Sequence, residues 1–301
     1  MDSAASHTRL FEVFLEVLDS GGVGAAATRL GLSPSAVSQA LRRLEESLGV
    51  ELYQRHSRPL RLTETGETME PVIRAALNSV ALVHATAADL RGVLAGELTI
   101  AALPTLAVEP LAGLVAEFRT AHPGVVVTVD QPRTRSIRGV ADSVREGRVD
   151  IGITELPSSF GGLASLHLEQ QTFFAVFPPD AEVHTSTVRI EDLLEYGLIV
   201  GPYWEESTVY RQLRKLDQRI DDAITVRTEH RETFIYLAAQ GLGAAIVLPD
   251  RARIAAQLGC RIAQFGPPIV RQAVVISQSN RLSPSVRAFL RICRRHAAHS
   301  H

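Results

Sequence analysis

The sequence predicts a multidomain α+β protein, with a winged helix-turn-helix at its N-terminus, a long linker helix, and a C-terminal α/β domain of two subdomains. Three observations support this prediction. Two helical segments flank a turn that contains Gly31, apolar residues repeat regularly over residues 64–90, and strand and helix patterns alternate beyond Gly92. We expect the three parts to span residues 1–63, 64–91 and 92–301.

The segment SAVSQALRRLEESLG at residues 35–49 predicts an amphipathic helix. Ser33 followed by Pro34 is typical of a helix start, because the Ser side chain caps the first turn and proline is tolerated at the first helical position. The short helix AAATRL, which itself follows a helix over residues 7–19, precedes this segment. Helix, tight turn and polar-faced helix together indicate a helix-turn-helix. The buried stripe comprises Val37, Leu41, Leu44 and Leu48.

The opposite face of this helix carries side chains that reach base edges or phosphates. An isolated arginine is usually a solvated surface charge, but several arginines converge here on two consecutive elements. The second is a small hairpin, or wing, predicted around Pro59. Because the net charge is only −2, the prediction depends on where the arginines lie. We predict DNA contacts from Ser33, Pro34, Ser35, Ser38, Gln39, Arg42, Arg43, Arg55 and Arg58.

The individual roles follow from the chemistry of each side chain. We assign Gln39 and Arg42 to base or near-base contacts, because both side chains can pair with base edges. Arg43 is assigned to phosphate or solvent, and Arg55 is expected to reach the adjacent groove or phosphate from the wing.

Residues 64–90 predict one continuous helix that dimerises the chain. Seven residues are spaced alternately by four and three positions, the pattern of a coiled-coil seam. The alternative is an exposed helix that packs only on its own chain. Pro71 lies inside the segment and is expected either to kink the helix or to fix its first turn. The predicted seam comprises Met69, Ile73, Ala76, Val80, Val83, Ala87 and Leu90.

Beyond residue 92 the sequence predicts alternating strands and helices with mostly parallel strands. Expected strands span 97–103, 125–130, 149–154, 172–177, 198–200, 223–228, 243–248 and 273–277. Expected helices span 105–120, a segment ending at 146, then 207–216, 231–240 and 284–295.

Ligands of open α/β sheets bind beyond the carboxyl ends of strands, where helix N-termini present N–H groups. Three strand-to-helix junctions meet this description: Leu103–Leu106, Gly201–Ser207 and Thr228–Glu232. Thr105 is equally suited to capping its helix, and Tyr203 and Trp204 are equally suited to packing at a rim. The candidate ligand-binding residues are Thr105, Thr154, Tyr203, Trp204, Glu229 and His230.

Several classes of protein are disfavoured. The N-terminus lacks the pattern of a signal peptide, and no apolar run is long enough to span a membrane, so a cytoplasmic protein is expected. Cys260 and Cys293 are too few for a disulfide framework or a zinc site, and are expected to be buried or half-buried thiols. The alternative is a redox switch pair, which requires both sulfur atoms to lie within bonding reach. No catalytic constellation is present, and no metal or cofactor is predicted; GLGAA at 241–245 is not a dinucleotide fingerprint.

The run AAATRLGLSPSAVSQALRRLEESLGVELYQR, continued by LRLTETG, resembles the N-terminal signature of LysR-type transcriptional regulators. Further segments, GELTIAALPTLA, FRTAHPGV, VREGRVDIGI and AAQGLGAAIVLP, resemble recurring parts of the family's effector domain, so the resemblance covers nearly the whole chain. Pro34 stands where many members carry Gln, and SGGVG replaces a Gly-Ser-aromatic sequence. The matching residues are Ala25–Ala26, Leu30, Ser33, Val37–Ser38, Leu44–Glu45, Leu48–Gly49, Leu52–Tyr53, Arg55, Leu62–Thr63 and Gly66.

The resemblance implies a winged helix-turn-helix repressor or activator that binds double-stranded DNA at inverted-repeat half-sites. It further implies a homodimer formed through residues 64–91, and a homotetramer as in many members. A small-molecule effector of unknown identity would bind between two subdomains that resemble type 2 periplasmic binding proteins. We place these subdomains at about 92–164 with 267–301, and at about 165–266.

Two rival functions share the α/β architecture. A solute-binding protein would need a signal peptide and no DNA-binding region, and an α/β enzyme with an appended DNA-binding-like domain would need a catalytic cluster. Salt-sensitive binding to a promoter would separate a regulator from both rivals.

Overall fold

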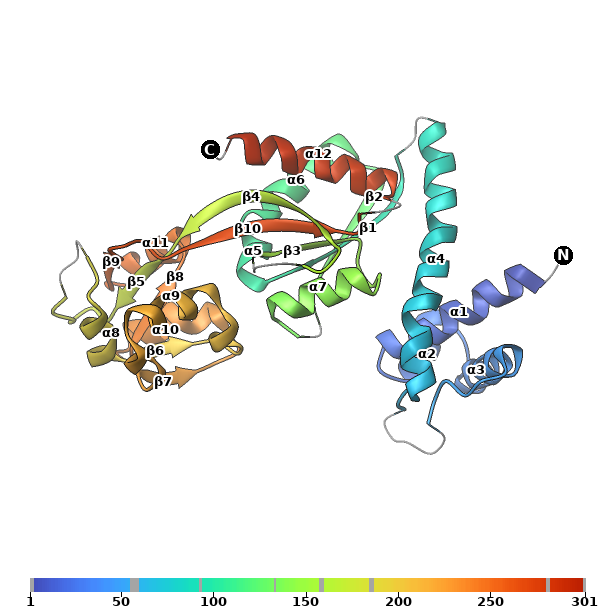
Figure 1. Ribbon diagram of the computed structural model, residues 1–301, viewed down its shortest axis with the longest axis horizontal. Helices are drawn as coiled ribbons and strands as arrows, with labels where there is room; N and C mark the ends of the chain where they lie inside the picture. The colour runs from blue at the N-terminus through green and yellow to red at the C-terminus, as the bar shows by residue number, and fades with distance from the viewer. Residues whose placement is uncertain are drawn as a thin grey trace.

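The computed structural model describes residues 3–54, 60–91, 94–132, 134–156, 160–183, 187–279 and 282–299, with the backbone alone at 3–6. The molecule is elongated (Figure 1): three N-terminal helices lie beside one end of the long helix α4, and two sheets follow. The second sheet lies at the end of the molecule farthest from α4.

The N-terminal helices have the predicted helix-turn-helix arrangement. The Ser33 side chain caps the third helix by accepting a hydrogen bond from the Ala36 N–H at 3.2 Å. Gly31 ends the second helix with a φ of 65°, a left-handed conformation that glycine adopts without a steric penalty. Val37 and Leu44 are completely buried in the core that the three helices share. The helices are α1 Ser3–Asp19, α2 Val23–Leu30 and α3 Pro34–Leu48.

The two arms of the expected wing pair with each other. Tyr53 and Leu62 form an antiparallel bridge, and the Thr63 N–H donates to the Leu52 carbonyl at 3.0 Å. The arms therefore return the chain to the start of α4. The tip of the wing, with Arg55 and Arg58, lies outside the described residues.

Helix α4, Glu64–Leu90, is continuous, but only its second half presents an exposed seam. Ile73 is 1% exposed and, like half-buried Met69, packs on the N-terminal helices of the same chain. The prediction of an intermolecular seam was therefore wrong at these two positions, which complete the core of the first domain. The remaining seam residues are exposed on one side of α4: Ala76, Val80, Val83, Ala87 and Leu90.

The first sheet combines parallel and antiparallel strands in the order β2-β1-β3-β10-β4. Strand β1 pairs parallel with β2 and β3, whereas β10 is antiparallel to β3 and β4. Helices α6 and α12 cover one face and α7 the other (Figure 1). The bounds are β1 Gly96–Ala102, α5 Pro104–Val108, α6 Leu111–Ala121, β2 Val125–Asp130, α7 Ile137–Arg145, β3 Ile151–Glu155, β4 Ala164–Thr172, β10 Val270–Ser277 and α12 Pro284–His299.

The second sheet has the order β7-β6-β8-β5-β9, with β6 parallel to β7 and β8, and β5 antiparallel to β8 and β9. Helices α8 and α9 pack on one face, and α10 and α11 on the other. The bounds are β5 Phe174–Phe177, α8 Ile190–Tyr196, β6 Leu198–Val200, η1 Trp204–Glu206, α9 Thr208–Leu216, η2 Gln218–Asp221, β7 Ile224–Arg227, η3 Arg231–Thr233, α10 Phe234–Ala239, β8 Ala244–Val247, α11 Pro249–Gln257 and β9 Arg261–Gln264.

Two details differ from the sequence predictions. Residues 165–172 were placed in the second subdomain, but β4 pairs along β10 in the first sheet, so the change of sheet falls at Phe173. The single helix expected over residues 105–120 is interrupted at Glu109 and Pro110. Proline lacks an N–H and disfavours helical backbone at the residue before it, which ends α5.

The cysteines lie in separate cores. Cys260 packs beside the second sheet and Cys293 beside the first, and both are free thiols. Burial raises the pKa of the Cys293 thiol to about 12. No helix within the described ranges is long and apolar enough to cross a membrane, and those same ranges contain no cluster of metal ligands.

Candidate functional site

The polar face of α3 is open to solvent. Ser33, Pro34, Ser35, Gln39, Arg42 and Arg43 are exposed, whereas Ser38 is half-buried and donates its hydroxyl to the Pro34 carbonyl at 2.9 Å. Among the residues that the structure describes, Arg42 and Arg43 form no hydrogen bond or ion pair. Both guanidinium groups are therefore available to an external partner.

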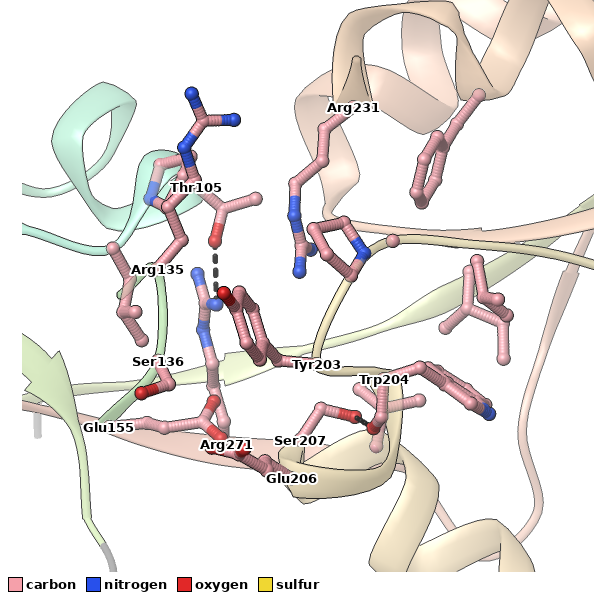
Figure 2. Close-up of a pocket in the computed structure, with 18 of the residues that line it drawn as sticks. Thr105, Arg135, Ser136, Glu155, Tyr203, Trp204, Glu206, Ser207, Arg231 and Arg271 are labelled. Carbon is pink, nitrogen blue, oxygen red and sulfur yellow. Dashed lines mark hydrogen bonds between the residues drawn. The ribbon is translucent and has the colours of Figure 1, made fainter. Parts of the chain in front are cut away.

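A cleft lies between the two subdomains, with an empty volume of about 810 Å³ that is partly open to solvent. Both subdomains contribute side chains to it (Figure 2). All three junctions predicted from the sequence reach this cleft, because the carboxyl ends of β1 and β6 and the segment after β7 converge there. The charged and aromatic lining residues are Arg135, Glu155, Phe173, Tyr203, Trp204, Glu206, Arg231, Phe234 and Arg271.

Arg271 is a buried cation in the wall of the cleft. It is 4% exposed and lies on β10. Its Nε donates to Gln171 Oε1 at 2.7 Å and its Nη1 to Thr105 Oγ1 at 2.7 Å, but its buried Nη2 has no hydrogen-bond partner among the residues that the structure describes. Burial lowers the pKa of Arg271 to about 10, so the guanidinium stays protonated at neutral pH.

Arg231 extends into the cleft from the second subdomain (Figure 2). Its guanidinium lies against the backbone of Gly201, where an added Cβ would lie 3.2 Å from Nη2. The Arg231 side chain is exposed in the cleft. The protein atoms around its guanidinium group nevertheless displace part of its hydration, and this desolvation lowers the pKa of Arg231. Within the described part of the chain it forms no hydrogen bond or ion pair.

The neighbouring charges already have partners across the cleft. Glu155 is 5% exposed, and its Oε1 accepts a hydrogen bond from the Thr208 N–H at 2.9 Å. A carboxylate of the first subdomain therefore caps the first turn of α9 in the second, where the helix dipole favours negative charge. At the rim, Arg135 Nη1 lies 4.0 Å from Glu229 Oε2.

The structure brings three of the six predicted ligand-binding residues into the cleft. Thr105, Tyr203 and Trp204 line it, and Tyr203 adopts an unusual positive φ of 57°. Thr154 is fully buried beside it, while the exposed Glu229 and His230 lie outside the lining.

The residues that sequence reasoning missed are mainly the cations. Arg231 lies inside one of the predicted junctions but was passed over for its neighbours. Arg271 precedes the strand expected at 273–277, and β10 in fact begins at Val270. A lone arginine within the apolar run IVRQAVVIS is the signal that could have revealed it, because an arginine buried in a sheet needs a specific reason.

A buried ion network connects the N-terminal domain to the rest of the chain. Glu70 of α4 receives Arg74 Nε at 3.1 Å and Arg148 Nε at 3.3 Å, while Arg74 also donates to Asp19 of α1 at 2.9 and 2.5 Å. Burial alone would lower the pKa of Arg74, but its bonds to Asp19 and Glu70 raise it overall. Arg148 follows α7, so the network joins α1, α4 and the first subdomain.

Comparison with known families assigns both halves of the chain. Residues 8–67 match the model of the bacterial regulatory helix-turn-helix protein, lysR family, and residues 91–298 match that of the LysR substrate binding domain. The chain belongs to the LysR family of transcriptional regulators. A LysR-type regulator combines a helix-turn-helix that binds DNA with an effector-binding domain, and this is the function of the chain.

Individual relatives agree over almost the full length. The probable transcriptional regulator LrrA of Synechococcus elongatus is 31% identical over 290 residues, covering 95% of this chain and 96% of LrrA. The regulator IlvR of Caulobacter vibrioides is 28% identical over 293 residues, covering 94% and 96% of the two chains.

Solved structures share the fold of this LysR-type chain. Full-length CbnR complexed with its target DNA aligns with a TM-score of 0.68 at 21% identity, covering 96% of this chain and 99% of CbnR. A full-length OxyR variant from Pseudomonas aeruginosa aligns with a TM-score of 0.70 at 19% identity, covering 96% and 94%.

Proposed function

We propose that this LysR-type regulator reads its promoter with the exposed face of α3, and that a small molecule in the inter-subdomain cleft controls this binding. The carrying observation is that Gln39, Arg42 and Arg43 are exposed together on a helix whose other face is buried. In this proposal Gln39 and Arg42 contact bases and Arg43 contacts phosphate, whereas Ser35 and Ser38 contact the DNA backbone or base edges. Arg55 and Arg58 of the wing contribute further phosphate or groove contacts.

The proposal predicts that Arg42→Ala weakens promoter binding at least roughly tenfold, because an arginine–guanine pair contributes about 1–3 kcal/mol of base discrimination. Gel shift of the full chain on its own upstream DNA measures the effect. Arg253→Ala is the matched control, because Arg253 is an exposed arginine of α11 whose replacement changes the net charge equally. Equal affinity of the two variants at physiological salt would remove Arg42 from the reading surface.

We further propose a homodimer that assembles into a homotetramer, with the exposed stripe on the second half of α4 as the dimer seam. At 100° per residue, Ala76, Val80 and Val83 lie on one side of the helix, whereas Asn78 and Leu82 lie on the other side, next to the same chain's effector domain. The seam is therefore left open by intrachain packing. A two-fold dimer would present two α3 helices to half-sites about one helical turn, or a multiple, apart.

The proposal extends to the domain boundaries, to the absence of enzyme activity and to the location of the protein in the cell. We assign DNA binding to residues 1–63, the linker to 64–91 and effector binding to 92–301. We also infer that the protein is not an enzyme, since its relatives are transcriptional regulators, and that it acts in the cytoplasm, where promoter DNA is accessible.

A further inference from the structure

We propose that the effector is a small organic carboxylate, whose negative charge lies between Arg271 and Arg231 and whose apolar part lies against Phe173 and Phe234. This inference deepens the proposed function and rests on it, because it names the chemical class of the molecule that the cleft binds.

Arg271 has unmet hydrogen-bonding capacity within the described residues. A buried guanidinium is normally fully paired, because leaving a buried donor without a partner is costly. Here Gln171 and Thr105 take two of its nitrogens, and the Phe173 ring lies 5.3 Å from its Cζ. The guanidinium group is therefore held firmly in place, while its Nη2 finds no hydrogen-bond acceptor within the described ranges of the chain.

Arg231 supplies a second positive charge to the cleft. It enters the same cleft from the other subdomain, lies against Gly201, and has no partner among the described residues. Two guanidinium groups that face one cleft repel each other, and an anion between them would relieve this repulsion. Such an anion would also connect the two subdomains.

The balance of charge favours a monoanion. Glu155 cancels one of the two positive charges and is already held by the Thr208 N–H. Arg135 is paired with Glu229 at the rim, and Glu206 is exposed. Figure 2 shows Glu155 and Glu206 on the side of Arg271 opposite Arg231. Glu169, which accepts a hydrogen bond from Gln171 Nε2 at 2.7 Å, also faces Arg271. With this second carboxylate near the two arginines, the cleft suits a carboxylate better than a phosphate dianion.

The lining beyond the arginines accounts for the apolar part. Phe173 and Phe234 are each 6% exposed at the cleft wall. A neighbouring hollow of about 890 Å³ empty volume, part of it open to solvent, shares both phenylalanines, Thr105, Arg231 and Ile246 with the cleft. Val108, Val247 and Leu248 also line it, together with the charged residues Glu109, Glu232, Asp250 and Arg251. Its carboxylates would repel a second negative charge, so this space suits the uncharged part of the acid. An acid with a hydrocarbon or aromatic body would fill it.

The experiment compares phenylacetate with phenylacetamide, which has nearly the same shape without the charge. Binding to the full chain is measured without DNA, by calorimetry and by the fluorescence of Trp204, the one tryptophan of the sequence and part of the cleft wall. We expect phenylacetate to bind at least roughly tenfold more tightly than the amide and more tightly than phenylphosphonate. Equal binding of acid and amide, tighter binding of the phosphonate, or no binding of phenylacetate at about 10 mM would overturn the proposal.

Single substitutions test which arginine binds the carboxylate group of phenylacetate. Arg231→Met should weaken phenylacetate binding at least roughly tenfold, whereas Arg219→Met should leave it unchanged, because Arg219 is an exposed arginine of the same subdomain and neither it nor its partner Asp217 lines the cleft or the hollow. Because Arg271 is buried and its removal could unfold the chain, Arg271→Lys is used there; it keeps a charge but loses the forked geometry, and should also weaken binding. Unchanged binding in both Arg231→Met and Arg271→Lys would refute the assignment.

Gel shifts with and without phenylacetate distinguish a failure of the carboxylate site from a failure of the proposed control of DNA binding. If phenylacetate binds but promoter affinity does not change, the carboxylate site stands and control of DNA binding through the cleft fails. If only uncharged molecules bind and alter promoter affinity, that control stands and the carboxylate assignment fails.

Discussion

Val80→Asp is expected to convert the protein into monomers and to weaken promoter binding about 100-fold or more. Val80 is 42% exposed and Val83 67% exposed in the single chain, although both are apolar residues on a long helix. In a two-fold seam the substitution places two carboxylates in one apolar contact. Burying unpaired charges costs several kcal/mol, and each 1.4 kcal/mol changes the dissociation constant tenfold. Sedimentation velocity at micromolar concentration measures the effect.

Leu216→Asp serves as the control for this variant. Leu216 is also an exposed apolar residue, 54% exposed, at the end of α9 and away from α4. It should leave both the assembly and DNA affinity unchanged. A Val80→Asp protein that sediments with the same mass as the Leu216→Asp protein would place the interface elsewhere.

Arg74→Met is expected to loosen the N-terminal domain by about 2–3 kcal/mol, which raises the opening equilibrium of α1 about 100-fold. The substitution removes two hydrogen bonds from Asp19 and one from Glu70, which keeps only Arg148 of its two arginine partners. Loss of one member of a buried ion network is destabilising because the remaining charges stay desolvated. The Arg74 and Glu70 side chains are only 7% and 9% exposed, whereas Asp19 is 39% exposed, so we expect somewhat less than the roughly 3–5 kcal/mol typical of a fully buried pair. Hydrogen exchange of peptides from α1, measured by mass spectrometry on the full chain, reports this opening.

Arg9→Met provides a matched comparison, because Arg9 lies on α1, the helix whose exchange is measured. Arg9 pairs with Glu12 at 2.8 Å, but both side chains are about half exposed. Exposed pairs contribute little, so exchange in α1 should change by less than about threefold. Similar exchange in the Arg9→Met and Arg74→Met proteins would show that the buried network adds no stability.

The N-terminal helices could be predicted to within a few residues because their signals are local. Ser33 and Pro34 start α3, Gly49 ends it, and the repeat of apolar residues marks its buried face. The same locality misled the prediction for Ile73: the heptad pattern identifies an apolar stripe on α4, but not whether the stripe meets α1 or a second copy. Only the packing of α1 beside α4 decides this question.

The effector domain was harder to predict where the determinants are distant in sequence. The three junctions converge on one cleft, as sheet topology requires, but Arg271 meets Thr105 across 166 positions. No local pattern reports such a contact. The strand β4, the helices α8 and α11, and the strand β9 were also missed, and β4 shows why: its half-exposed, polar sequence does not reveal that β10 will pair with it.

Helix α7 directly connects the cleft with α4. Its capping residue Ser136 lines the cleft, and the turn after its last residue places the Gly147 carbonyl 2.9 Å from Asn78 Nδ2 of α4. Nine helical residues, about 14 Å in length, therefore separate the cleft from α4. A displacement of α7 at the cleft is therefore expected to move α4 as well.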